Sequence, residues 1–407
     1  MISLSPVQSL LACCLTLLLG RFLSTRISFL ARYCIPDPII GGLIFATTTY
    51  ILSKWGNVQI SLETTIRPTL LLLFFGCLGL TAKLKLLAKG GSRLVILLLI
   101  LLPFLVLQNI VGLGLAALLD MHPLMGLIAG TVTLVGGHGT STAYASRFSD
   151  INNIQNIVAL AMTSATIGLV LGGTLGGPVA EWLLKRHKIK TPVQNGETAI
   201  RTSESVYNEN EIHHSEMNKP SSFVNSISAA LITLVSGTYL SGLVDQAHIN
   251  LPNFLLCLAS GILIRNIGPS IGFCLDDRVT EIVSAIVLSM FLGLTMMTLD
   301  LASAARLAGP LAMMLGVQAI VCVIYCCIVV FRVLKADYEA AAIAGAFCGI
   351  CLGTTATAIA NMQAITKSHG PAPQSFIVVP IAGAFLVDIL NVIVLTALIS
   401  LPFVGGV

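Results

Sequence analysis

Long apolar runs constrain this chain more than any other feature of its sequence. A helix that crosses a bilayer needs about 17–25 such residues, or somewhat fewer where polar residues flank the run. Runs of this kind occur near 6–29, 37–53, 68–82, 94–119, 154–184, 223–243, 251–264, 282–299, 307–331 and 374–401. Only 10% of the 407 residues are charged, whereas a soluble domain carries about 25%. We therefore expect an all-α polytopic membrane protein. No basic stretch precedes the first run and no small-residue cleavage site follows it, so we expect the first span to be retained.

Two further apolar segments, 123–146 and 338–366, contain stretches that interrupt a helix. The stretch Leu134–Ser146 reads LVGGHGTSTAYAS, and glycines disfavour a helix because they lose the most backbone freedom on ordering. The stretch Gly349–Asn361 reads GICLGTTATAIAN and resembles the first. Unpaired backbone groups are costly in lipid, so broken backbone at membrane depth lies inside protein or lines a polar cavity. These two stretches are our candidate binding site.

The distribution of lysine and arginine predicts how the two broken segments lie in the membrane. Cytoplasmic loops are enriched in these residues. If both segments enter and leave on the same side, ten spans remain, the N-terminus lies outside, and 18 of the 22 lysines and arginines are cytoplasmic. If both segments cross, the division is 10 against 12 and the asymmetry disappears. We therefore expect one re-entrant hairpin in each half of the chain.

Five spans in the first half place the second half in the opposite orientation, so an internal repeat would be inverted. Residues 127–130 (LIAG) match residues 342–345 (AIAG), and residues 140–143 (TSTA) match residues 355–358 (TATA) at the same offset of 215. Residues 35–37 (IPD) also resemble 251–253 (LPN), and Gln108 resembles Gln318. Inverted repeats with broken segments are typical of secondary transporters, which bind substrate and coupling ions near the bilayer midplane.

These observations predict three parts: an N-terminal repeat over 1–184 with a hairpin near 123–146, a polar cytoplasmic linker over 185–222, and a C-terminal repeat over 223–407 with a hairpin near 338–366. The linker has low hydrophobicity and no apolar periodicity, which favours a flexible tether. His213 and His214 lie in it without a third ligand at metal-site spacing. With an even number of spans, we expect both termini on the periplasmic side.

In the first hairpin, the glycines allow backbone amides to approach a ligand, and helix N-termini beside the break favour an anion. Hydroxyl groups add donors and acceptors. The candidate substrate-binding residues of this hairpin are Gly136, Gly137, His138, Gly139, Thr140, Ser141 and Thr142. Two alternatives stay open: the small residues can form a helix–helix contact, and His138 can line the site or cap the turn.

The second hairpin and the last span supply candidates for substrate and cation binding. Thr355, Thr357 and Asn361 are candidate substrate ligands, and Gly353 and Thr354 expose oxygens that suit Na⁺. Asp388 lies inside an apolar run, and Asn391 follows on the same helix face. Since an ionisable residue at such a depth is by default a functional hypothesis, we assign both residues to Na⁺. A buried structural hydrogen bond is the alternative.

Other chemistry is disfavoured. No G-x-x-x-x-G-K-[ST] phosphate loop occurs, which disfavours ATP-driven transport, and no G-x-S-x-G stretch supports a hydrolase, so we expect no enzyme activity and no cofactor beyond the coupling ion. The small net charge of +4 gives no reason to expect a nucleic-acid partner. The cysteines, including Cys348 and Cys351, fall in or beside apolar runs, where packing explains them better than metal binding or redox chemistry.

Several longer segments resemble the bacterial sodium/glutamate symporters. They are TLLLGR (16–21), PLMGLIAG (123–130), GGHGT (136–140), GLVLGGTLGGPVA (168–180), TAIANMQAIT (357–366) and VVPIAGAFLVDILN (378–391). The resemblance covers nearly the whole chain except the linker. It implies Na⁺-coupled uptake of L-glutamate across the bacterial inner membrane, two inverted five-helix halves with re-entrant glycine-rich loops, and a dimeric elevator-type carrier.

By position, the resemblance assigns Gly136, Gly137, His138 and Gly139 to the first loop and Gly349, Gly353, Thr355, Thr357 and Asn361 to the second. Asp388 and Asn391 match the acid and amide of the last span. The chain departs from the expected pattern where Cys351 replaces a glycine and Ala356 replaces a proline, and both changes relax the turn of the second loop.

Three alternatives remain at this stage. The same donors would bind another organic anion, such as a hydroxy-dicarboxylate, with Na⁺. A channel would show uptake without accumulation, and a receptor would show no flux. The inverted repeat favours a carrier. The sequence does not fix the Na⁺ stoichiometry, the stereoselectivity or the group that binds each carboxylate.

Overall fold

The computed structural model of the chain describes residues 2–27, 37–56, 59–85, 91–152, 157–192, 220–246, 253–271, 273, 275–298 and 301–401. Most of the predicted linker, including His213 and His214, lies outside these residues, as do Met1 and residues 402–407 at the two ends of the chain.

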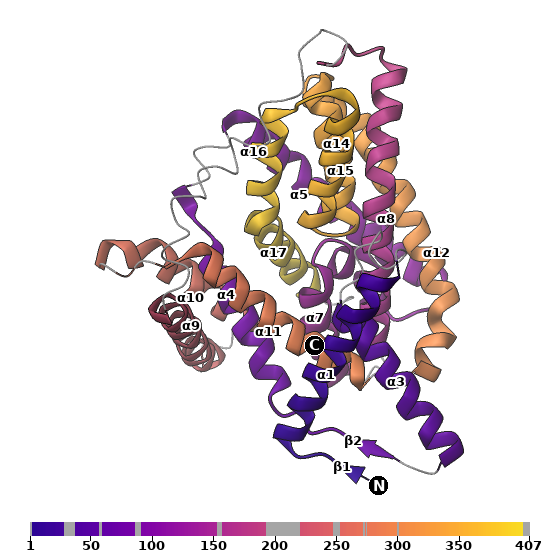
Figure 1. The fold of residues 1–407 in the computed structure, drawn as a ribbon. Helices are drawn as coiled ribbons and strands as arrows, with labels where there is room; N and C mark the ends of the chain where they lie inside the picture. Colours follow the sequence, from indigo (N-terminus) through magenta and orange to yellow (C-terminus); the bar gives the residue numbers. More distant parts are fainter. Residues whose placement is uncertain are drawn as a thin grey trace. The chain divides into compact units, whose positions relative to one another are not determined.

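The described chain is helical apart from two short paired strands (Figure 1). Its first half contains β1 (Ile2–Ser3), α1 (Pro6–Arg26), α3 (Asp37–Gly56), β2 (Ile60–Ser61), α4 (Arg67–Thr81), α5 (Gly91–Leu118), α6 (Pro123–Leu127), η2 (Ile128–Val132), α7 (Gly137–Asn152) and α8 (Ile157–Arg186). Its second half contains α9 (Pro220–Gln246), α10 (Asn253–Ile267), η4 (Gly268–Ile271), α11 (Asp277–Met297), α12 (Leu301–Tyr325), η5 (Cys326–Val330), α13 (Phe331–Val333), α14 (Tyr338–Leu352), α15 (Thr355–His369), α16 (Pro373–Ile381), η6 (Ala382–Leu386) and α17 (Val387–Ile399).

Every apolar run expected to span a membrane contains helix, and the protein is an all-helical polytopic membrane protein. Among the described residues, six helices are long and apolar enough to cross a bilayer: Pro6–Arg26, Gly91–Leu118, Leu160–Arg186, Pro220–Val244, Asp277–Met297 and Gly309–Val333. The last expected span is not one regular helix, because the π-helical segment η6 separates α16 from α17. Such a bulge shifts the register of a helix and often accompanies a functional position.

The chain forms two compact units, and each unit takes residues from both halves of the sequence. Unit 1 comprises residues 1–83, 145–160 and 217–308, and unit 2 comprises residues 84–144, 161–216 and 309–407. The helices α7 and α8 each have residues in both units.

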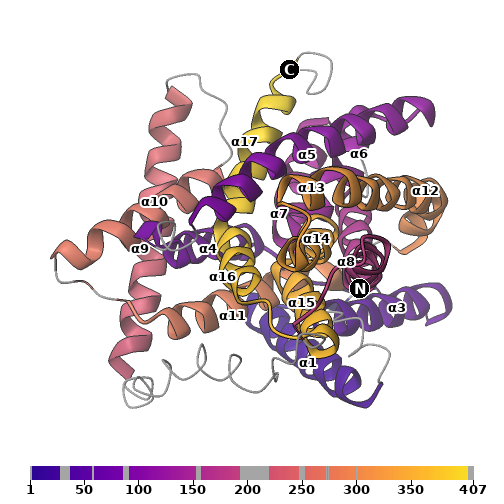
Figure 2. The same ribbon diagram turned by 90° about the horizontal axis from the view of Figure 1, so that it is seen from above.

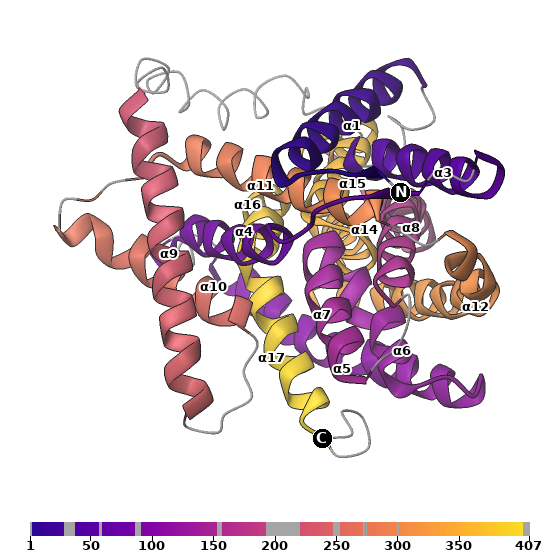
Figure 3. The same cartoon turned by 90° about the horizontal axis from the view of Figure 1, so that it is seen from below.

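Unit 1 is built from α1, α3, α4, α9, α10 and α11. The helix α4 packs on α9, α10 and α11, while α1 packs on α3 and α11 (Figure 3). Close approach depends on small residues: a methyl group added at Gly76 in α4 would lie 2.1 Å from the hydroxyl of Thr233 in α9. Without a strong hydrophobic driving force between helices in lipid, such small-residue contacts supply much of the packing. The strands pair in parallel, with Ile2 opposite Ile60.

Unit 2 contains both helix breaks that the sequence predicts, whereas residues 145 and 146 at the end of the first segment belong to unit 1. The helix α5 packs on α6, η2, α16 and α17, and α14 packs on α15, α16 and η5 (Figure 2). The buried ring of Phe104 lies 4.8 Å from that of Tyr325 and 5.2 Å from that of Phe347, measured between ring centroids. This aromatic cluster joins α5 to α12 and α14.

Candidate functional site

The first broken segment runs from α6 through η2 to α7. The backbone leaves the helical conformation at Gly130, which has φ −100° and ψ −137°. The chain then forms a turn at residues 135–136 before α7 begins. Gly137, the first residue of α7, has φ +59°. This left-handed conformation costs a residue with a side chain about 1–2 kcal/mol, which explains the glycine at this position. The helix is interrupted inside the predicted stretch 134–146, at residues 135–136, but the rest of that stretch, from Gly137 onward, is helical and belongs to α7.

A buried polar pair on α5 and η2 holds the start of this break. The amide nitrogen of Asn109 donates to the hydroxyl of Thr131 at 2.8 Å, and the backbone N–H of Thr131 donates to the Asn109 side-chain oxygen at 3.3 Å. Both residues are fully buried. Because an unpaired backbone group in this environment would be costly, Asn109 satisfies backbone that the irregular helix leaves open.

The second broken segment lies between α14 and α15. Gly353 leaves the helical conformation with φ −147° and ψ −104°, and Thr354 follows as the N-cap of α15. Thr354 and Thr357 form a reciprocal capping box, in which the Thr354 N–H donates to the Thr357 hydroxyl at 2.9 Å. The Thr357 hydroxyl in turn lies 2.9 Å from the carbonyl oxygen of Gly349 in α14. One threonine therefore joins the two sides of the break.

The two breaks meet in unit 2, although they are distant in sequence. A Cβ atom added at Gly137, where α7 begins, would lie 3.6 Å from the Thr354 methyl carbon, where α15 begins. The N-termini of two helices of 16 and 15 residues therefore lie side by side. A helix N-terminus presents unpaired N–H groups and a partial positive charge, and both features favour an anion.

Several predicted ligands of the first break already have polar partners inside the protein. The ring of His138 lies 3.3 Å from the hydroxyl of Thr166 in α8. The hydroxyls of Ser141 and Thr142 donate to the carbonyl oxygens of Gly137 and His138, one helical turn earlier. The side chains of His138, Thr140, Ser141 and Thr142 are all buried. The hydroxyl oxygens of Thr140, Ser141 and Thr142 retain the capacity to accept a hydrogen bond.

The remaining candidates tie the breaks to neighbouring helices. Asn361 donates to the carbonyl of Gly172 in α8 at 2.8 Å, which places its amide in a helix–helix contact. Thr355 donates to the carbonyl of Gly383 in η6 at 2.6 Å. Asn391 in α17 donates to the carbonyl of Thr131 at 3.1 Å, next to the first break. Asp388 lies in the first turn of α17, one turn before Asn391.

Three buried amide oxygens near these breaks accept no hydrogen bond within the described part of the chain: those of Gln108, Gln318 and Asn391. The amide nitrogen of each residue is bound to a backbone carbonyl, at 3.1 Å for Gln108 with Cys351, 2.8 Å for Gln318 with Gln108, and 3.1 Å for Asn391 with Thr131. Among these, sequence reasoning assigned only Asn391 to the site. The available signal was a polar side chain in the middle of an apolar run, which also applies to Asn109.

Broken helices whose N-termini meet inside an apolar helical protein are features of membrane transporters. The sodium/glutamate symporter family matches residues 2–371 of the chain. The chain is 38% identical to the sodium/glutamate symporters of Escherichia coli (strain K12) and Shigella flexneri over 407 residues, covering 100% of both sequences in each pair. It is 35% identical over 390 residues to that of Haemophilus influenzae, covering 95% of each sequence.

The chain belongs to the sodium/glutamate symporter family. It is therefore a member of a transporter family and not an enzyme, as the sequence predicts. The family match ends before α17, but the two full-length relatives extend the similarity through Asp388 and Asn391.

Proposed function

We propose that this protein is a secondary active transporter that imports L-glutamate together with Na⁺ across the bacterial inner membrane. The observation that supports it most directly is the junction of two helix N-termini at Gly137 and Thr354, which suits a carboxylate. The family and the full-length relatives, which are named sodium/glutamate symporters, supply the identity of the substrate and the coupling ion.

Glutamate carries two carboxylates and one ammonium group, so its site needs several donors and at least one acceptor. Each helix N-terminus carries about half a positive charge. We propose that backbone N–H groups at the two helix starts bind the carboxylates, and that nearby hydroxyl and carbonyl oxygens accept from the ammonium group. The residues assigned to substrate are Gly136, Gly137, His138, Gly139, Thr140, Ser141, Thr142, Thr355, Thr357 and Asn361.

The coupling ion is assigned to the residues around the second break and the last helix: Gly353, Thr354, Asp388 and Asn391. Na⁺ is a hard cation that prefers oxygen ligands, and unwound backbone in transporters commonly coordinates it. The buried, unpaired side-chain oxygen of Asn391 supports this assignment. The Thr355–Gly383 hydrogen bond also supports it, because it links the second break to η6, directly before the helix that carries Asp388.

The proposed architecture has two inverted repeats, 1–184 and 223–407, joined by the linker 185–222, with a re-entrant hairpin in each repeat. Packing in unit 1 supports the repeat. In the proposed repeat, α1, α3 and α4 correspond to α9, α10 and α11 in that order. The contact between α1 and α3 then corresponds to the contact between α9 and α10, and the contact between α1 and α11 corresponds to the contact between α9 and α4.

Individual contacts follow the same correspondence, within two residues of the sequence offset. Ser24 donates to the Asp37 side chain at 2.7 Å, and Ser241 donates to the Asn253 side chain at 2.7 Å. Likewise, Gly76 in α4 approaches the backbone of Ala230 in α9, and Gly293 in α11 approaches Cys13 in α1.

In this proposal the termini are periplasmic, the linker is cytoplasmic, and a homodimer works by an elevator-type alternating-access mechanism. Each unit charge that crosses a potential of 100 mV inward gains about 2.3 kcal/mol. Coupled Na⁺ therefore drives accumulation of glutamate without ATP.

The test is uptake of labelled L-glutamate into proteoliposomes that contain the purified protein, with an inward Na⁺ gradient or with K⁺ in place of Na⁺. We expect accumulation above equilibrium only with Na⁺, and competition by unlabelled glutamate but not by malate. Na⁺-driven accumulation of malate instead would change the substrate to a hydroxy-dicarboxylate. Uptake that never exceeds equilibrium would indicate a channel, and no flux of either anion would refute the transport function.

A further inference from the structure

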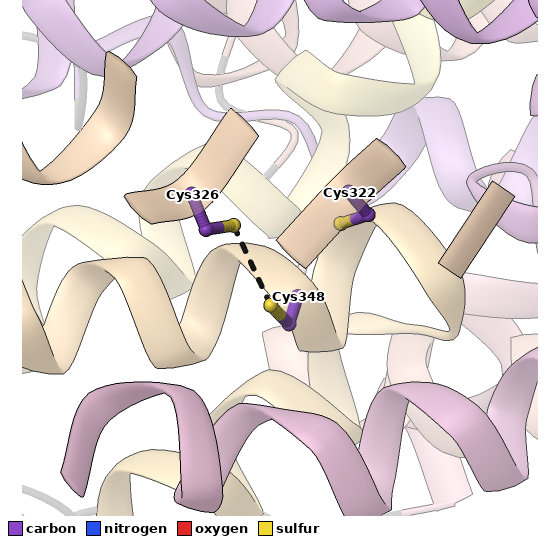
Figure 4. A group of neighbouring side chains, drawn as sticks. All are labelled: Cys322, Cys326 and Cys348. Atoms are coloured by element: carbon purple, nitrogen blue, oxygen red, sulfur yellow. Dashed lines mark hydrogen bonds between the residues drawn. The ribbon is translucent and has the colours of Figure 1, made fainter. Parts of the chain in front are cut away.

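Three cysteines of unit 2 place their sulfur atoms together inside the protein. Cys322 in α12, Cys326 in η5 and Cys348 in α14 have Sγ atoms that all lie within 4.8 Å of one another (Figure 4). The Sγ atoms of Cys326 and Cys348 are 3.4 Å apart, and none of the three residues forms a disulfide. All three side chains are completely buried. We call this group the cysteine cluster.

The spacing of the sulfurs suits a single central atom. A centre bonded to three thiolates at about 2.3 Å, the length of a zinc–thiolate bond, places the sulfurs no more than about 4 Å apart. The 3.4 Å between Cys326 and Cys348 is below this value, and the 4.8 Å limit on all three separations is close to it, so small rotations about the Cα–Cβ bonds would complete the site. Cys322 and Cys326 are one helical turn apart on the same face, and Cys348 faces them from the neighbouring helix.

Burial decides which kind of element such a site can hold. Thiolate sulfur is a soft ligand that selects soft, thiophilic elements. Three thiolates around a divalent ion have a net charge of −1, and around a monovalent ion −2. An isolated charge in an apolar interior is strongly disfavoured. Three thiolates around a trivalent centre have no net charge.

We propose that the cysteine cluster is a binding site for trivalent thiophilic elements that enter as neutral hydroxides, of which arsenite is the probe. In the reaction, As(OH)₃ and three protein thiols yield As(S-Cys)₃ and three water molecules. Three As–O and three S–H bonds break, three As–S and three O–H bonds form, and arsenic stays in the trivalent state. Because the cluster is closed to solvent, loading proceeds through local opening and is slow.

The site lies close to the second break but is separate from the residues assigned to glutamate and Na⁺. Cys348 lies in the last turns of α14, which ends at Leu352 before Gly353. Three bonds to one arsenic atom would fix α14 to η5. Since the proposal concerns binding of arsenic, its test does not depend on transport.

The experiment treats the purified, reduced protein with arsenite and measures bound arsenic by intact-protein mass spectrometry. We expect the wild type to bind one more arsenic atom per chain than Cys348→Ala, with a mass gain of one arsenic less three hydrogens. Cys77→Ala removes a buried cysteine of unit 1 and serves as the matched control. We expect it to bind as many arsenic atoms per chain as the wild type. Cys322→Ala and Cys326→Ala repeat the measurement in case Cys348→Ala does not fold.

X-ray absorption at the arsenic edge supplies the second readout. We expect three sulfur neighbours for the arsenic bound to the wild type, and an arsenic signal in Cys322→Ala that is lower by the same one atom per chain. Equal arsenic binding by the wild type and all three cluster variants would overturn the proposal, as would an arsenic atom with oxygen neighbours in the wild type.

Discussion

Thr357 is the residue whose replacement tests the geometry of the second break most directly. Its hydroxyl accepts from the Thr354 N–H at 2.9 Å and lies 2.9 Å and 2.7 Å from the carbonyl oxygens of Gly349 and Thr354. The side chain is 2% exposed. Thr357→Val keeps the branched shape but replaces the hydroxyl with a methyl group, so the Thr354 N–H loses its partner.

The expected loss follows from that single backbone group. A buried donor without a partner costs about 1–3 kcal/mol, and loss of the reciprocal cap acts on the same N-terminus of α15. This energy corresponds to an approximately 5- to 150-fold shift in an equilibrium. We therefore expect Thr357→Val to lower the stability of the protein and to weaken Na⁺-driven glutamate uptake, because α15 no longer starts in a fixed position.

Thr357→Ser is the matched control, since it keeps the hydroxyl and removes only the methyl group. Thermal unfolding in detergent and uptake into proteoliposomes are measured for both variants. We expect the unfolding temperature and the glutamate uptake of the serine variant to stay near those of the wild type. Both quantities should be lower for the valine variant. If the two variants lose stability and uptake equally, the methyl group matters and our account of the hydroxyl is refuted.

Three further predictions rest on other contacts. Asp388→Asn should raise the Na⁺ concentration needed for half-maximal uptake while membrane insertion stays normal, and unchanged Na⁺ activation would exclude a cation role. Gly176→Ala should destabilise the protein by about 1–3 kcal/mol, because the new methyl group would lie 2.1 Å from an amide nitrogen; Gly177→Ala, which meets no atom within 4 Å, should not. Ser24→Ala and Ser241→Ala should both lower the unfolding temperature, Ser24→Ala more so because its acceptor is a carboxylate; if only one is destabilising, the repeat correspondence loses support.

Much of the helical structure was predictable because lipid leaves few options for a long apolar run. The runs near 6–29 and 94–119 correspond to α1 and α5 within a few residues. The division into two units was not predictable in the same way. Unit 1 takes α1, α3 and α4 from one half of the chain and α9, α10 and α11 from the other. Contacts such as Gly76 with Thr233 depend on which helices meet, and periodicity within one helix does not contain that information.

In the candidate site, too, local backbone features were predictable from the sequence, whereas contacts between remote segments were not. Clustered glycines predicted the interruptions at Gly137 and Gly353, because backbone preference is local. The approach of Gly137 to Thr354 depends on how remote segments pack, and only a weak repeat pointed to it. The cysteine cluster shows the limit most clearly. Sequence reasoning considered Cys348 with Cys351 and favoured packing, whereas the fold brings Cys348 to Cys322 and Cys326 on a neighbouring helical segment.

The two helix starts also explain how the proposed carrier can bind glutamate without an arginine deep in a span. A carrier must change its conformation when the site is empty as well as when it is loaded, and an unpaired buried charge would be costly in the empty state. Two helix N-termini together provide about one positive charge that is spread over backbone N–H groups. That amount matches the net charge of −1 on glutamate, so the loaded site is nearly neutral before Na⁺ enters. The ion then needs a counter-charge of its own, and we propose that Asp388, one turn from Asn391 in α17, provides it.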